Sequence, residues 1–272
     1  MKKIIIIATI IVIAIITTGF ALINGLNEEK INVLIYGVDG REGAEESERS
    51  DAIILANYNF TSSKIVVTSI PRDSYVKITC KNNDYDKINH AYAYGGEKCL
   101  NETVSQLFEI KNVKNALLSF EDVVKIVDYF GLIEITPKYT FCQSDENLEN
   151  KYCFEKGKKI LIDGEQTLAY MRNRKSLPNG DLSRTENQRQ IFKVLVERFL
   201  KLSLVEKIKF YKYAKQNIKT DLKFNDLNIK KLINVKQIEL SEYTLKGEGY
   251  INKYYYYKLD HSYLEKIKKY YI

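Results

Sequence analysis

The sequence lacks the residue patterns of several common enzyme and metal-binding classes. None of its four cysteines belongs to a C-x-x-C pair, and neither His90 nor His261 has partners at zinc-ligand spacing. A zinc site is therefore not expected. The chain also has no G-x-S-x-G nucleophile elbow, no G-x-x-x-x-G-K-[ST] phosphate loop and no H-E-x-x-H motif. These absences argue against the hydrolases, nucleotide-binding proteins and zinc proteases that carry those motifs.

Charged residues are absent from Ile4 to Ile23, directly after Met1-Lys2-Lys3. About 20 apolar residues span a bilayer, and the two lysines favour a cytoplasmic N-terminus. A cleaved signal peptide is the alternative, but the end of the run offers no Ala-x-Ala-like site. We expect a cytoplasmic stub at 1–3, a single transmembrane anchor at 4–23, a spacer at 24–30 and an extracellular domain at 31–272, held at the cell membrane.

An extracellular location permits disulfides. The cysteines are Cys80, Cys99, Cys142 and Cys153, which allow three pairings among which sequence cannot choose. We favour Cys80–Cys99 and Cys142–Cys153, because these bonds would link the two most loop-like regions. Four free thiols are the alternative.

Three short apolar runs, 31–38, 52–59 and 65–70, predict buried strands. The polar stretch 60–64 predicts a hairpin turn, which makes the second and third strands antiparallel. If the first strand is parallel to the third, Asp39, Asp51 and Arg72 meet at one edge of the sheet. Open α/β sheets bind ligands at such edges.

The rest of the chain alternates predicted helices and strands. Ser74 to Ile78 could extend the sheet, an apolar stripe predicts a helix from near Glu97, and Ser119 to Gly131 predicts another. A strand is expected at 132–136, followed by a loop or irregular hairpin at 138–159. Capped helix starts are expected at Asp163, Ser183 and Ser203, strand-like alternation at 235–245, and a last helix from Ser262. This alternation indicates an α/β or α+β fold.

Asp39 and Asp51 are two carboxylates at neighbouring strand ends. Mg²⁺ prefers hard oxygen ligands and often binds one or two carboxylates together with substrate phosphates. The pair therefore fits a metal site, although both could equally be solvated turn residues.

Arginine is scarce beside a large excess of lysine, yet it recurs at the ends of predicted elements. Guanidinium groups grip phosphate in a bidentate manner, whereas an ammonium acts as a point charge. We interpret these arginines as an anion site, with surface ion pairing as the alternative. In this interpretation an extended Arg172–Arg174 segment presents two side chains on one face, and Arg184 lies in the first turn of its helix with Gln188 one turn on. The five arginines are Arg49, Arg72, Arg172, Arg174 and Arg184.

The formal net charge is +7 and the sequence pI is about 8.9. This balance fits an anionic partner such as a membrane surface, nucleic acid or a phosphate polymer. A coding bias toward lysine explains it equally well.

Taken together, the motifs resemble the LytR–CpsA–Psr family of bacterial cell-wall phosphotransferases. They occur in the family's order over about residues 31–200, and the set is far more specific than any one segment. The matching segments are Asn32–Asp39, Arg49–Asp51, Ser69–Asp73, Asp86–Tyr92, Asp163–Gln166, Tyr170–Arg174, and Asp181 with Arg184–Gln188. Gly247–Tyr250 also resembles the family's C-terminal end.

The resemblance implies a three-layer α/β/α sandwich with a central mixed sheet. It implies transfer of a glycopolymer, such as teichoic acid or capsule, from an undecaprenyl-pyrophosphate carrier to a peptidoglycan sugar hydroxyl, with formation of a phosphodiester. By motif position, Asp39 and Asp51 would bind Mg²⁺ or Mn²⁺ and act in catalysis with Arg49 and Arg72. Asp73 and Asp181 are candidates for a general base. The pyrophosphate would be held by Arg49, Arg72, Lys87, Arg172, Arg174, Arg184 and Gln188.

Two other functions stay open. One is a membrane-anchored polyprenyl-phosphate binding or regulatory module without turnover, and the other is a pyrophosphatase. Intact aspartates and arginines favour the transferase, because binding alone need not keep both carboxylates. The expected partners are the lipid-linked glycopolymer, a peptidoglycan acceptor and membrane lipid, and not nucleic acid.

Overall fold

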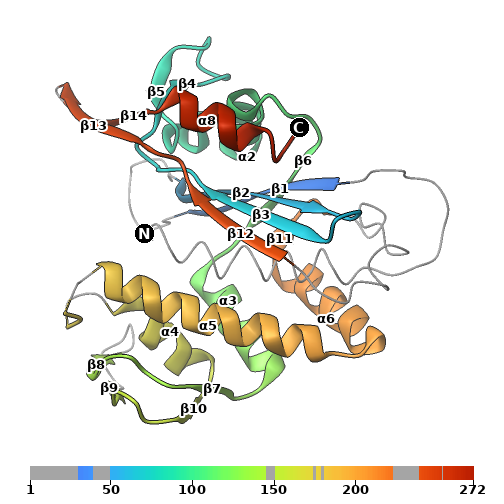
Figure 1. Ribbon diagram of the computed structural model, residues 1–272, viewed down its shortest axis with the longest axis vertical. Helices are drawn as coiled ribbons and strands as arrows, with labels where there is room; N and C mark the ends of the chain where they lie inside the picture. Colours follow the sequence, from blue (N-terminus) through green and yellow to red (C-terminus); the bar gives the residue numbers. More distant parts are fainter. Residues whose placement is uncertain are drawn as a thin grey trace. The chain divides into compact units, whose positions relative to one another are not determined.

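A computed structural model describes residues 30–38, 50–144, 151–173, 176–178, 181–222, 239–252 and 254–272 (Figure 1). The predicted anchor at 4–23 and the stretch past Asn225 lie outside these ranges. The chain packs as two compact units. The first lies within Gly19–Leu117 and Lys219–Ile272, and the second within Leu118–Ile218.

The first unit is organised around a six-stranded mixed sheet in the order β11-β6-β1-β2-β3-β12. β2 is antiparallel to both β1 and β3, while β6 is parallel to β1 and β12 is parallel to β3. β1 and β3 therefore run in the same direction, which is the condition under which their ends were expected to meet at one edge of the sheet. The predicted mixed α/β class is confirmed. The strands are β1 (Lys30–Val38), β2 (Ser50–Asn59), β3 (Lys64–Ser69), β6 (Val113–Leu117), β11 (Lys219–Thr220) and β12 (Glu239–Thr244).

The turn between β2 and β3 confirms the predicted hairpin. The side-chain oxygen of Asn59 accepts hydrogen bonds from the backbone N–H groups of Thr61 and Ser62, each at 2.9 Å. These hydrogen bonds to an Asn side chain satisfy two backbone N–H groups that have no partner strand in the turn. Ile31 to Tyr36 are all buried, which confirms the prediction that this apolar run forms a buried strand.

One face of this sheet packs against α2 (His90–Phe108) and α8 (His261–Lys268) (Figure 1). Leu34 and Leu55 of the sheet share this core with Leu100 of α2. Tyr271, just beyond α8, donates its hydroxyl proton toward the sheet, 2.8 Å from the Leu55 carbonyl oxygen. The helix predicted from near Glu97 corresponds to the part of α2 after Gly96, and the part from His90 to Tyr94 was not predicted. Gly95 and Gly96 have non-helical dihedrals, and this kink hides the first turn from the apolar period.

Two hairpins complete the first unit: β4 (Tyr75–Lys77) with β5 (Tyr85–Lys87), and β13 (Gly247–Asn252) with β14 (Tyr254–Leu259). The expectation that Ser74 to Ile78 extends the central sheet is wrong. These residues pair with β5 instead, and Ser74 bridges to Tyr257 of β14.

The second unit is mainly helical. Its elements are α3 (Phe120–Phe130), β7 (Ile133–Ile135), β8 (Phe141–Ser144), β9 (Lys151–Phe154), β10 (Ile160–Ile162), α4 (Gly164–Arg172), α5 (Asp181–Lys201) and α6 (Leu204–Asn217). Capping boxes at Ser119, Asp163 and Ser203 start α3, α4 and α6, in agreement with two of the three predicted boxes and the predicted cap at Ser119. The box at Ser183 is wrong, because α5 already begins at Asp181.

Both favoured disulfides are confirmed: Cys80–Cys99 joins the loop after β4 to α2, and Cys142–Cys153 joins β8 to β9. Within the described ranges, no helix combines the length and apolarity needed to span a membrane. The third layer implied by the family resemblance stays a prediction.

Candidate functional site

The predicted site residues Arg72 and Asp73 lie in a turn at the end of β3. Pro71 has no backbone N–H and ends the ladder. The Ser74 hydroxyl and backbone N–H both donate to the Pro71 carbonyl oxygen, at 2.6 and 2.9 Å, and so close the turn. The backbone N–H of Asn89 donates to the Arg72 carbonyl oxygen at 3.1 Å. The segment after β5 is thereby held against this turn.

Asp73 brings the predicted cations Arg72 and Lys87 together. Its carboxylate lies 2.9 Å from the Lys87 ammonium and 3.6 Å from the Arg72 guanidinium. The β4–β5 register produces this arrangement, because Tyr75 pairs with Lys87 and so places Lys87 beside the β3 turn. Two cations around one carboxylate carry a net positive charge, which suits a phosphate group.

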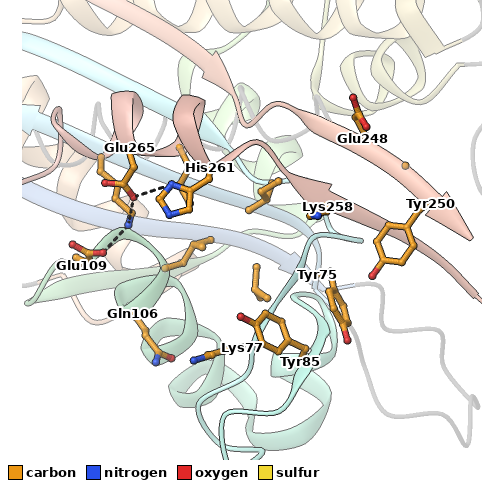
Figure 2. A pocket seen from close by; sticks show the side chains of 16 residues that line it. Tyr75, Lys77, Tyr85, Gln106, Glu109, Glu248, Tyr250, Lys258, His261 and Glu265 are labelled. Carbon is orange, nitrogen blue, oxygen red and sulfur yellow. Dashed lines mark hydrogen bonds and ion pairs between the residues drawn. The ribbon is translucent and has the colours of Figure 1, made fainter. Parts of the chain in front are cut away.

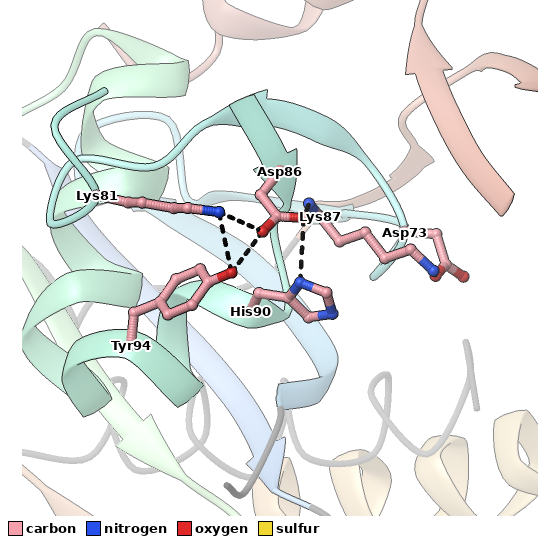
Figure 3. Close-up of polar contacts among 6 residues, drawn as sticks. All are labelled: Asp73, Lys81, Asp86, Lys87, His90 and Tyr94. Atoms are coloured by element: carbon pink, nitrogen blue, oxygen red, sulfur yellow. Dashed lines mark hydrogen bonds and ion pairs between the residues drawn. The ribbon is translucent and has the colours of Figure 1, made fainter. Parts of the chain in front are cut away.

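Asp86 is the centre of a second polar cluster, which faces α2 (Figure 3). Its carboxylate accepts hydrogen bonds from the Tyr94 hydroxyl at 2.5 Å, the Lys81 ammonium at 3.0 Å and the Lys87 backbone N–H at 2.8 Å. The Nδ1 atom of His90 lies 3.1 Å from the same carboxylate. Partial burial by itself raises the pKa of Asp86, but these hydrogen bonds outweigh it and hold the pKa well below its usual range.

This cluster fixes the orientation of His90. With the Nδ1 atom directed at Asp86, the Nε2 atom is the ring nitrogen left for a hydrogen bond to another group. The side-chain oxygen of neighbouring Asn89 is buried and accepts no hydrogen bond in the described part of the chain. Buried polar atoms are nearly always paired in native proteins, so an unpaired one within a motif indicates a place where a ligand or water binds.

Sequence reasoning noted Lys87 and His90 but missed the central role of Asp86. Part of the signal was present, because His90 and Tyr94 are four residues apart on α2, the spacing at which helical side chains meet. Asp86 lies in β5 and has no place in that helical period. Lys81 carried no such signal, because only the β4–β5 turn brings it back to Asp86.

The second unit holds Arg172 at the last position of α4. The expectation that Arg172 to Arg174 is extended is therefore wrong for Arg172. The Asn187 side-chain amide donates to the Tyr170 carbonyl oxygen at 3.2 Å, and the Tyr170 hydroxyl donates to Gln190 at 2.7 Å. These bonds tie α4 to α5, the two helices that carry the family's second group of motifs.

The other predicted residues are placed only in part. Asp39, Arg49 and Arg174 lie outside the described residues. Asp51 lies in β2, in the irregularity where the pairing shifts between Gly37 and Val38, and Arg184 is the fourth residue of α5. The side chains of Asp51, Asp181, Arg184 and Gln188 are not described.

Val38, the last residue of β1, pairs with Ser50, the first residue of β2, so the two strand ends meet one residue before Asp51. In the described ranges, no group of three or more His, Cys, Asp or Glu residues could hold a metal ion. The assignment of Asp39 and Asp51 to a metal site stays a prediction.

Comparison with known proteins decides the family. The model of the LytR_cpsA_psr family matches residues 17–271. The chain belongs to this family. It is similar to the polyisoprenyl-teichoic acid–peptidoglycan teichoic acid transferase TagU of Bacillus licheniformis, with 35% identity over 247 residues that cover 89% of this chain and 76% of the relative.

Solved structures of LytR_cpsA_psr proteins agree. Bacillus subtilis TagV superposes with a TM-score of 0.70 at 25% identity, covering 90% of this chain and 96% of TagV. The family protein YwtF (TagT) with bound octaprenyl pyrophosphate lipid superposes with a TM-score of 0.62 at 25% identity, covering 91% of this chain and 92% of that chain.

Proposed function

We propose that this chain transfers a glycopolymer from an undecaprenyl-pyrophosphate carrier to a cell-wall acceptor, typically a peptidoglycan sugar hydroxyl. The observation that carries the proposal is the Arg72–Asp73–Lys87 cluster within a family whose relatives are named as teichoic acid transferases and include one solved with octaprenyl pyrophosphate. The carried glycopolymer would be teichoic acid, capsule or a related polysaccharide.

In this reaction the acceptor hydroxyl oxygen bonds to the phosphorus that carries the glycopolymer. The bond from that phosphorus to the bridging oxygen breaks, polyprenyl phosphate leaves, and the hydroxyl proton passes to a base. Arg72 and Lys87 would stabilise negative charge on the phosphates, with Arg49, Arg172, Arg174, Arg184 and Gln188 as further ligands. Asp73 already pairs with both cations, so its role would be to position them, and Asp181 stays a candidate base.

Mg²⁺ or Mn²⁺ held by Asp39 and Asp51 would neutralise further charge on the transferring phosphoryl group. The adjacency of the β1 and β2 ends supports this pairing. We also propose that residues 4–23 anchor the chain in the membrane with the N-terminus in the cytoplasm. The site would then lie outside the cell, close to the lipid carrier.

The test is a transfer assay with the full chain in detergent micelles. Polyprenyl-pyrophosphate-linked saccharide and peptidoglycan fragments are supplied with and without Mg²⁺, and polyprenyl phosphate and the new phosphodiester are measured. Arg72→Ala should lower transfer by at least about 100-fold, while Lys98→Ala, which removes an exposed cation of α2, should not. Full activity of Arg72→Ala would reject the head-group assignment. Lipid binding without release would favour the binding module, and release without transfer the pyrophosphatase.

A further inference from the structure

A groove of about 970 Å³ lies in the first unit, between α2, α8 and the hairpins β4–β5 and β13–β14 (Figure 2). Tyr75 and Tyr85 line it from one hairpin, and Tyr250 lines it from the other. We call this feature the tyrosine groove. Its volume is in the range of ligand sites, which are typically about 300–1,000 Å³.

The tyrosines form one connected set of rings. The centroid of Tyr75 lies 5.1 Å from that of Tyr85 and 6.1 Å from that of Tyr250. Tyr256 extends the set, because its ring lies 5.1 Å from Tyr75 and 5.6 Å from Tyr250. Tyr75 and Tyr85 are 37% and 53% exposed. Side chains of this size and exposure indicate a binding surface when they cluster.

The polar lining argues against a hydrocarbon ligand. Glu248, Lys77 and Lys258 line the same groove, and a lipid chain there would remove their charges from water at a large cost. The exposed rings are all tyrosines, which offer a hydroxyl as well as an aromatic face. The groove therefore suits a ligand with both an apolar face and many hydroxyl groups.

The charge balance argues against a polyanion. Three lysines and three glutamates line the groove, and the Lys268 ammonium lies 2.7 Å from both Glu109 and Glu265. A polyphosphate would gain little net attraction from such a surface. A neutral polysaccharide fits better. Its pyranose rings present C–H groups that the negative face of an aromatic ring attracts, and its hydroxyl and acetamido groups can pair with carboxylates and ammonium groups.

Tyr256, whose ring contacts Tyr75 and Tyr250, links the tyrosine groove to Lys87 of the candidate site. Direct pairing in β4–β5 places Tyr75 and Lys87 on one face of the hairpin. The Lys87 ammonium lies 5.6 Å from the centre of the Tyr256 ring, within cation–π range, and 2.9 Å from Asp73. A chain bound along the tyrosines would therefore extend toward the residues proposed to hold the phosphates.

We propose that the tyrosine groove binds a neutral glycan strand of N-acetylated hexosamines and presents the acceptor hydroxyl to the site beside Lys87. This inference rests on the proposed function, because it assigns a place to the acceptor in that reaction. It adds Tyr75, Tyr85, Tyr250 and Tyr256 as acceptor-binding residues.

The probe is a β-1,4-linked N-acetylglucosamine hexamer, titrated into the full chain in detergent micelles by isothermal titration calorimetry. Tyr75→Ala and Tyr250→Ala should each weaken binding by about tenfold, since one aromatic contact contributes roughly a factor of this size. Tyr75→Phe should keep most of the affinity. Tyr255→Ala is the matched control: this tyrosine is 48% exposed on the same strand as Tyr256, but its side chain lies on the opposite face.

Absence of hexamer binding at millimolar concentration would overturn the proposal, as would full affinity in Tyr75→Ala. So would tyrosine-dependent binding of polyphosphate or octaprenyl phosphate in place of the hexamer. If Tyr75→Ala does not fold, Tyr85→Ala takes its place. Arg72→Ala should keep hexamer affinity. The two proposals fail separately: transfer without hexamer binding rejects only the tyrosine groove, and hexamer binding without transfer rejects only the proposed reaction.

Discussion

Replacing Asp86 by asparagine should destabilise the first unit at neutral pH. The Asp86 side chain is only 13% exposed and accepts hydrogen bonds from Tyr94, Lys81 and the Lys87 backbone. Asparagine keeps one acceptor oxygen but presents an NH₂ donor to at least one of these donors. Hydrogen bonds to a charged group contribute about 1.5–3 kcal/mol each and do not add simply. We therefore expect a loss of about 2–4 kcal/mol in the free energy of unfolding.

The loss should depend on pH in a defined direction. The pKa of Asp86 is lowered in the folded state, whereas in the unfolded chain it is about 3.9. The carboxylate therefore contributes its full stabilisation above the unfolded pKa, and this contribution disappears as the pH falls through the lower, folded pKa. The difference between wild type and Asp86→Asn should be largest at pH 7 and should shrink steadily below about pH 4.

Urea unfolding at pH 7 and pH 3, followed by circular dichroism with the disulfides intact, measures this difference. Asp84→Asn is the control, because Asp84 is exposed and lies two residues before Asp86, just outside β5. It should change the free energy of unfolding by no more than about 0.5 kcal/mol. Equal losses in the two variants, or a difference for Asp86→Asn that does not change with pH, would refute the reasoning.

Two further changes test the packing of each unit. Replacing Cys80 and Cys99 together by serine should lower the free energy of unfolding by about 3 kcal/mol. The reason is that the disulfide closes a loop of 19 residues and so reduces the entropy of the unfolded chain. An unchanged urea midpoint would contradict this expectation. Gly164→Ala should cost about 1–3 kcal/mol, because the new methyl group would lie 2.6 Å from side-chain atoms of Val124 and Asp128. The melting temperature of this variant is measured by differential scanning calorimetry. An unaltered value would contradict the prediction, because it would show that α3 and α4 move apart at that contact without cost.

Local patterns were enough to predict much of the fold. The apolar runs of β1, β2 and β3 and the Asx turn between two of them are set by neighbouring residues, as are the caps at Ser119, Asp163 and Ser203. Errors arose where a distant partner decides the structure. β4 pairs with β5 and not with the central sheet, and α5 begins at Asp181, before the Ser183 pattern that looked like a cap.

By itself, the sequence determined the types of most strands and helices and the family, because periodicity, capping chemistry and ordered motifs are all written along the chain. Only the tertiary structure decided which charges meet. The β4–β5 register places Lys87 beside Asp73, and the turn before β5 returns Lys81 to Asp86. The tyrosine groove has the same origin: its rings come from residues about 175 positions apart, Tyr75 and Tyr250. Such contacts depend on long-range strand pairing, which leaves no local period to detect.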